Sequence, residues 1–165
     1  ASDLDVDELP TRLSAVLPVG IEVTGAARLE DRAPALQEAV TAVTWLAEVE
    51  TPTDPDAVRT AVERGLAATE LPARRRRKGR EVTEDLRPVI RSVTVQDAPS
   101  ATGGVVLALE LGTHPRSARP EEVLAAFGLT CSRARRTGQW MERDGARLEP
   151  LDADTRPRVI EARAS

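Results

Sequence analysis

Apolar residues recur along this chain with two periods, one typical of helices and one typical of strands. Leucines at helical spacing predict a helix over residues 5–17, which Pro18 would end. Residues 21–29 carry alternating apolar side chains and predict a strand. Because a single helix and a single strand cannot bury both of their faces, we interpret residues 1–30 as the remnant of an incomplete N-terminal unit.

Between residues 41 and 141 the pattern predicts six elements, in the order strand, helix, strand, strand, helix, strand. The two helices are expected to begin at Pro55, after an Asp54 cap, and at Pro120, since proline suits the first position of a helix. The strands are expected over residues 43–49, 89–96, 105–111 and 129–141.

This order of elements predicts a ferredoxin-like β-α-β-β-α-β fold of the α+β class. In that fold the first and third strands are central, and residues 43–49 and 105–111 are the apolar ones. The run 105–111 is the most continuously apolar one in the chain, which predicts a central strand buried on both faces. We therefore expect a ferredoxin-like domain over residues 31–142 and a flexible tail over residues 143–165.

Composition narrows the classes of function. Of the 165 residues, 41% are hydrophobic and 30% are charged, and the net charge of -4 does not suit general binding of polyanions. One cysteine, Cys131, excludes a disulfide, a cysteine-ligated zinc site and a radical SAM cluster within this chain. We expect no cofactor, no metal and a cytoplasmic location. No apolar run approaches the roughly 18 residues of a membrane helix, so no membrane contact is expected.

One stretch concentrates positive charge on this acidic chain. Six of the seven residues 74–80 are cationic, and Gly79 is the exception. Several guanidinium groups can hold phosphate oxygens, whereas the alternative is a solvated arm or a charged edge strand. With no tyrosine, one phenylalanine and two tryptophans, a stacking platform for single-stranded RNA is poorly supported. In one extended strand the cations would alternate between two faces, with Arg74, Arg76, Lys78 and Arg80 on one and Arg75 and Arg77 on the other.

Several short motifs occur in a fixed order. They are Leu-Pro-Val-Gly-Ile-Glu-Val at 17–23, Arg-Lys-Gly-Arg at 77–80, Asp-Leu-Arg-Pro at 85–88, Arg-Pro-Glu-Glu-Val-Leu at 119–124 and Arg-Thr-Gly-Gln-Trp at 136–140. Together they resemble the uncharacterised radical SAM-linked domain family, often fused to or encoded beside B12-binding radical SAM proteins. The resemblance implies an accessory domain linked to radical SAM chemistry and, more loosely, to RNA modification. The further N-terminal segment of that family is absent here, so any site formed with it would be incomplete or supplied by another chain.

Single residues offer weaker candidates. Asp85 beside Arg87 could be a general base next to a phosphate anchor, although an aspartate in this position more often forms a local cap or ion pair. His114, the only imidazole, lies in a loop close in sequence to two arginines and is either a phosphate contact or an exposed loop residue. Cys131 is expected to pack as a small hydrophobic side chain, and Trp140 to cover the sheet.

Three functions follow from these observations. The first is a non-catalytic RNA-binding domain associated with RNA modification, for example of tRNA. The second is a module that docks a radical SAM protein or a missing N-terminal segment of the same protein. The third is an RNA-modifying enzyme that uses Asp85. For the first, the expected phosphate contacts are Arg74, Arg75, Arg76, Arg77, Lys78, Arg80, Arg87, Arg116 and Arg119.

Overall fold

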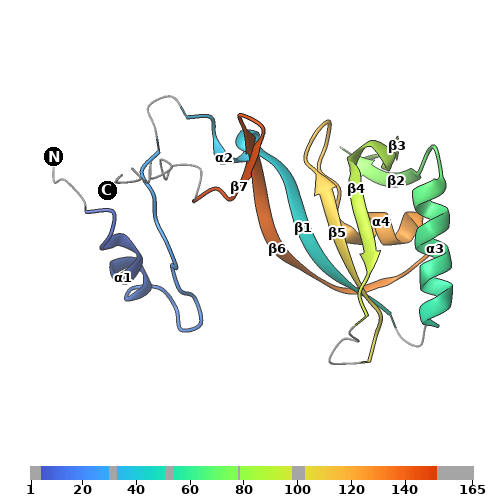
Figure 1. The fold of residues 1–165 in the computed structure, drawn as a ribbon, viewed down its shortest axis with the longest axis horizontal. Helices are drawn as coiled ribbons and strands as arrows, with labels where there is room; N and C mark the ends of the chain where they lie inside the picture. Colours follow the sequence, from blue (N-terminus) through green and yellow to red (C-terminus); the bar gives the residue numbers. More distant parts are fainter. Residues whose placement is uncertain (1–4, 30–32, 51–53, 78, 98–102, 152–165) are drawn as a thin grey trace, which may run out of the picture. The chain divides into compact units, whose positions relative to one another are not determined.

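The structure is a computed structural model that describes residues 5–29, 33–50, 54–77, 79–97 and 103–151 (Figure 1). Its chain divides into two compact units. One comprises residues 40–140, and the other comprises residues 1–39 together with residues 141–165. Among the described residues, no helix is both long enough and apolar enough to cross a membrane.

The unit of residues 40–140 has the predicted α+β fold. Its elements are β1 (Val40–Val49), α3 (Pro55–Ala67), β2 (Pro72–Arg77), β3 (Arg80–Asp85), the 3-10 turn η1 (Arg87–Val89), β4 (Ile90–Val95), β5 (Val106–Gly112), α4 (Pro120–Ala126) and β6 (Cys131–Arg143). The main sheet has the order β4-β5-β1-β6, and β5 pairs antiparallel with both β1 and β4. This arrangement is compatible with the ferredoxin-like fold, and it confirms that β1 and β5 lie between the other strands.

Both helices begin where the sequence predicts. The Asp54 carboxylate accepts a hydrogen bond from the Asp56 N–H at 3.2 Å, and Pro55 takes the first helical position of α3. Pro120 opens α4, whose buried side includes Val123 and Leu124. Figure 1 shows both helices beside the part of the sheet formed by β4 and β5. The helices therefore supply the apolar layer that the sheet needs on one face.

The strand β5 corrects one expectation, because it is not buried on both faces. Leu107, Leu109 and Leu111 are buried, whereas the residues between them are only half-buried. Alternate side chains of a strand point to opposite faces, so only the face toward the helices is fully covered. An apolar run of this length cannot by itself distinguish one covered face from two, because Val106 and Ala108 are apolar without being buried.

Two hairpins were not predicted. The cationic stretch forms β2, which pairs antiparallel with β3 in a separate two-stranded sheet. At the other end, the last residues of β6 pair with β7 (Ala146–Leu148) through a turn at Asp144 and Gly145, with φ of 51° and 77°. Asp-Gly is a strong signal for such a turn, so β7 could have been found from the sequence. Residues 152–165 of the expected tail lie outside the described residues.

The unit that contains the N-terminus has little regular structure. It holds α1 (Leu9–Ser14), which is shorter than predicted, and α2 (Leu36–Ala39). Residues 21–29 form no strand, which corrects the prediction. A strand needs a hydrogen-bonded neighbour, and these residues pair with none in the part of the chain that the structure describes. Instead the Val23 N–H donates to the Ser14 hydroxyl at 2.9 Å, which ties this segment to α1.

Candidate nucleic-acid interface

The cationic stretch is a tight β-hairpin, and its register decides where each charge lies. Arg74 is opposite Thr83, Arg75 is opposite Val82, and Arg77 is opposite Arg80. The turn between the strands contains Gly79, whose φ of 81° favours glycine. Because the turn reverses the chain, position 80 shares a face with positions 75 and 77. This corrects the single-strand expectation that grouped it with Arg74 and position 76.

The two faces of the hairpin differ in exposure. Arg74, Glu81 and Thr83 are exposed and belong to the outer face. Arg75 and Val82 are half-buried and belong to the inner face, which lies on the side of α4, because β2 contacts that helix. The structure describes the backbone of Arg76 and Arg77 but not their side chains, and Lys78 lies outside the described residues.

Hydrogen bonds fix the base of the hairpin. The Leu86 N–H donates to the Leu71 carbonyl at 2.9 Å. The exposed Asp85 carboxylate accepts from the Leu71 N–H at 2.7 Å and from the Arg87 N–H at 2.9 Å. These two bonds, with a smaller contribution from the Arg87 charge, hold the pKa of Asp85 below its ordinary value against a weaker opposing effect of desolvation. Asp85 therefore closes the hairpin as an ionised cap, and a lowered pKa makes it a poor general base.

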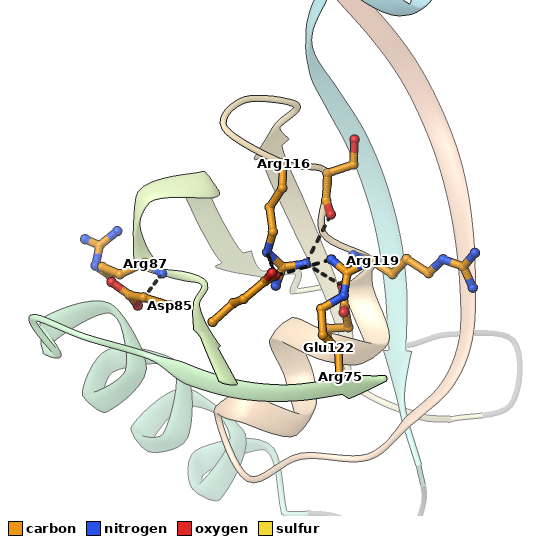
Figure 2. Close-up of polar contacts among 8 residues, drawn as sticks. Arg75, Asp85, Arg87, Arg116, Arg119 and Glu122 are labelled. Atoms are coloured by element: carbon orange, nitrogen blue, oxygen red, sulfur yellow. Dashed lines mark hydrogen bonds and ion pairs between the residues drawn. The ribbon is translucent and has the colours of Figure 1, made fainter. Parts of the chain in front are cut away.

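A chain of charged side chains ties the inner face of the hairpin to α4 (Figure 2). Glu84 Oε2 lies 3.4 Å from Arg75 Nη1 and 3.0 Å from Arg116 Nε, and Glu122 Oε2 lies 3.6 Å from Arg116 Nη1. Only 15% of the Arg116 side chain is exposed. The contact between Arg116 Nε and Glu84 is an ion pair, since no hydrogen bond reaches that buried nitrogen among the described residues. Two arginines and two glutamates thus compensate one another.

Arg87 and Arg119 also make local structural contacts. The Arg87 guanidinium donates to the carbonyls of Ile90 and Leu66, each at 3.3 Å, and in Figure 2 it lies apart from the cluster around Arg116. The backbone N–H of Arg119 donates to the Glu122 carboxylate at the start of α4. Arg119 itself is an exposed residue. Of the expected phosphate contacts, Arg75, Arg87 and Arg116 are therefore engaged with the protein itself.

Positive charge without such a partner remains on the outer face and at the tip of the hairpin. Arg74 and Arg80 are exposed, and neither side chain makes an ion pair or hydrogen bond to any residue that the structure describes. Positions 77 and 80 are partners in the last pair of the β2–β3 ladder.

The glutamates that pair with Arg75 and Arg116, and so distinguish these two arginines from the exposed ones, were not predicted from the sequence. Glu84 and Glu122 come from β3 and α4, and nothing in the spacing of the sequence brings Glu84 to Arg116. Glu122 had a signal, because it is the third residue of a helix opened by Pro120 and caps that helix through the Arg119 N–H. The ion-pair chain itself depends on tertiary packing.

Three candidates from the sequence remain, and they are His114, Cys131 and Trp140. His114 is exposed, and its Nδ1 lies 3.0 Å from the Thr113 hydroxyl. Cys131 is half-buried, and burial raises the pKa of its thiol. Trp140 is half-buried and its Nε1 donates to Thr44 Oγ1 at 3.3 Å. Over the described ranges, no group of three or more His, Cys, Asp or Glu side chains could hold a metal ion.

Comparison with known proteins gives one family and one distant structure. A family model described as "Uncharacterized protein conserved in bacteria (DUF2344)" matches residues 1–120. No curated protein matches the chain significantly. A solved structure entitled "Crystal Structure of a Cbf5-Nop10-Gar1 Complex" is similar with a TM-score of 0.42 and 13% identity, over 63% of this chain. The match spans 32% of that chain, about a third, and at this TM-score it decides neither fold nor function.

Proposed function

This chain belongs to the uncharacterised bacterial family DUF2344, and on that premise we propose that it is an accessory domain that binds RNA through the β2–β3 hairpin. The resemblance of its motifs to radical SAM-linked domains supports a setting of RNA modification, in which another protein would carry out the reaction. The arginines of the hairpin would anchor phosphates and position the RNA without reading its bases.

The observation that carries this proposal is the division of charge within the hairpin. Glu84 forms ion pairs with Arg75 on the inner face and with the neighbouring Arg116. Arg74 and Arg80, in contrast, are exposed and have no such acidic partner among the described residues. Guanidinium groups are good donors to phosphate oxygens. Since the protein as a whole is acidic, with a net charge of -4, bound RNA would be held locally at the hairpin.

A protein-docking role is the second candidate, and one observation favours it. In the unit that contains the N-terminus, apolar side chains are exposed, among them Val16 at 79%, Ile21 at 55% and Leu29 at 69%. Exposed apolar side chains that cluster in one segment are typical of contact surfaces. A radical SAM protein or a further segment of the same protein would be the partner. This role is compatible with RNA binding at the hairpin of the other unit.

The catalytic alternative receives less support from the site. Asp85 is exposed, and a single oxygen of its carboxylate accepts both backbone hydrogen bonds that hold the base of the hairpin. Those hydrogen bonds lower the pKa of the Asp85 carboxyl, which makes the carboxylate a weak acceptor of a substrate proton. We therefore place Asp85 in the support of the binding site.

Charge reversal on the hairpin tests the proposal. The double substitution Arg74→Glu/Arg80→Glu should lower the affinity for RNA in a low-salt mobility-shift assay by about 100-fold, because two phosphate contacts become repulsive. The matched control is Arg133→Glu/Arg135→Glu, which makes the same charge change at exposed positions of β6. Equal loss in both variants, or no loss in the hairpin variant, would contradict a hairpin site.

A further inference from the structure

The three aromatic side chains of this chain are all engaged elsewhere in the protein. Phe127 is 2% exposed and packs at Gly65 of α3. The Arg136 guanidinium lies over Trp45, 4.9 Å from the ring centroid, and Trp140 donates to Thr44. With no tyrosine in the sequence and no aromatic residue in the hairpin, the site offers no aromatic ring on which unpaired bases could stack. Single-stranded RNA is recognised mainly through such stacking.

The hairpin carries cationic positions on both of its faces. Arg74 belongs to the outer face, while Arg80 belongs to the opposite face at the tip. Side chains on the two faces of a ribbon point away from one another, so Arg74 and Arg80 extend to opposite sides of the backbone. Such a ribbon can approach two rows of phosphates at once. A duplex offers two rows, one on each side of a groove, whereas a single strand offers one.

The base of the hairpin is held firmly. Asp85 and Leu71 close it with hydrogen bonds, and the ion pair of Glu84 with Arg116 fixes it against α4. A site of fixed geometry suits a ligand whose phosphates already have a fixed spacing. A flexible strand would have to be ordered on binding, which costs conformational entropy.

From these observations we infer that the hairpin binds double-stranded RNA in preference to single-stranded RNA. This inference rests on the proposed function and specifies its ligand. The duplex is recognised by shape, through phosphates and the 2′-hydroxyl groups of its wide and shallow minor groove. Arg74 and Arg80 supply the contacts from the two faces.

The test compares two RNA probes with the full chain at one salt concentration. One probe is a duplex of about 20 base pairs, longer than the ~16 base pairs that a compact duplex-binding domain spans. The other is an oligouridine strand with the same number of phosphates. The duplex should bind at least about tenfold more tightly. The Arg133→Glu/Arg135→Glu variant should keep this preference, and Arg74→Glu/Arg80→Glu should lose it.

The outcomes separate this inference from the proposed function. Equal or tighter binding of the oligouridine would overturn the preference for duplex RNA and leave RNA binding at the hairpin in place. Absence of binding to either probe would overturn both. A duplex preference that survives Arg74→Glu/Arg80→Glu would also overturn the inference, because the recognition would then lie outside the hairpin.

Discussion

Glycine at position 65 is explained by the packing of a neighbouring side chain and not by the preferences of its own helix. It lies inside α3, where glycine costs roughly 1 kcal/mol relative to alanine. It is buried, and a Cβ atom at this position would clash with three atoms of the Phe127 ring, all of which would lie closer than van der Waals contact. The absence of a side chain therefore lets the only phenylalanine pack against the helix.

We predict that Gly65→Ala lowers the free energy of unfolding even though alanine is the better helix former. Crowding in a packed core costs about 1–3 kcal/mol, which exceeds the gain in helix propensity. Chemical denaturation measures the change. In a double-mutant cycle, Phe127→Leu should reduce the cost of Gly65→Ala by making room for it. A stabilised Gly65→Ala variant would show that the packing is looser than described.

A second prediction concerns how the contribution of Asp85 to stability depends on pH. Its pKa is lowered in the folded state, so on acidification the unfolded chain takes up the proton first. The contribution to stability is therefore present above the ordinary pKa of 3.8 and is lost as the pH falls below it. The difference in unfolding free energy between the wild type and Asp85→Asn should accordingly shrink between about pH 7 and about pH 2.5. A difference that is constant over this range would mean that the charge of Asp85 adds nothing.

At the scale of elements, the hairpin depends on ion pairs that lie beneath it. Glu84 is the link between Arg75 of β2 and Arg116 in the loop before α4. Removing the charge of Glu84 would leave the mostly buried Arg116 with Glu122 as its remaining acidic partner, at 3.6 Å. An arginine in that position is costly to leave incompletely paired.

We predict that Glu84→Gln lowers the free energy of unfolding by about 1–3 kcal/mol. The matched control is Glu81→Gln, which removes the same charge from an exposed position on the other face of β3 and should change stability by less than about 0.5 kcal/mol. Thermal and denaturant unfolding would measure both. If the two variants lose the same stability, the ion-pair chain contributes only through net charge.

The elements that the sequence predicted are those with local signals. Asp54 with Pro55, and Pro120 with its glutamates, mark the two helix starts through interactions within one turn. The strand β2 had no such signal, because a run of arginines lacks the apolar alternation of a strand and gains its order from β3. The segment 21–29 had the alternation but no neighbouring strand. A pairing strand decided both cases, because β2 has one in β3 and residues 21–29 have none among the described residues.

The features of the candidate site also divide into those that are visible in the sequence and those that depend on packing. The cationic character of residues 74–80 and the importance of Asp85 and Arg87 are visible in the sequence. Which arginines are engaged is not, because Glu84 compensates Arg75 and Arg116 only after the hairpin has packed beside α4. The turn at Gly79 further decided which positions share a face. These features follow from register and packing.

The whole molecule is an acidic protein that carries a local cationic site at the β2–β3 hairpin. The net charge of -4 opposes general binding of nucleic acid, whereas the hairpin attracts phosphate over about the Debye length of 10 Å at 0.1 M salt. Binding to RNA should therefore be confined to few phosphates and should weaken as salt is added. If RNA were attracted uniformly over the whole surface, a charge change at any exposed position would lower the affinity for RNA equally.

The most direct test of hairpin binding is the dependence of RNA affinity on salt. A plot of the logarithm of the association constant against the logarithm of salt concentration should be linear with a negative slope for the wild type. Its magnitude should fall by about 2 in Arg74→Glu/Arg80→Glu, one for each lost phosphate contact, and stay unchanged in Arg133→Glu/Arg135→Glu. An affinity independent of salt, or the same slope in the wild type and the hairpin variant, would contradict phosphate anchoring by the hairpin.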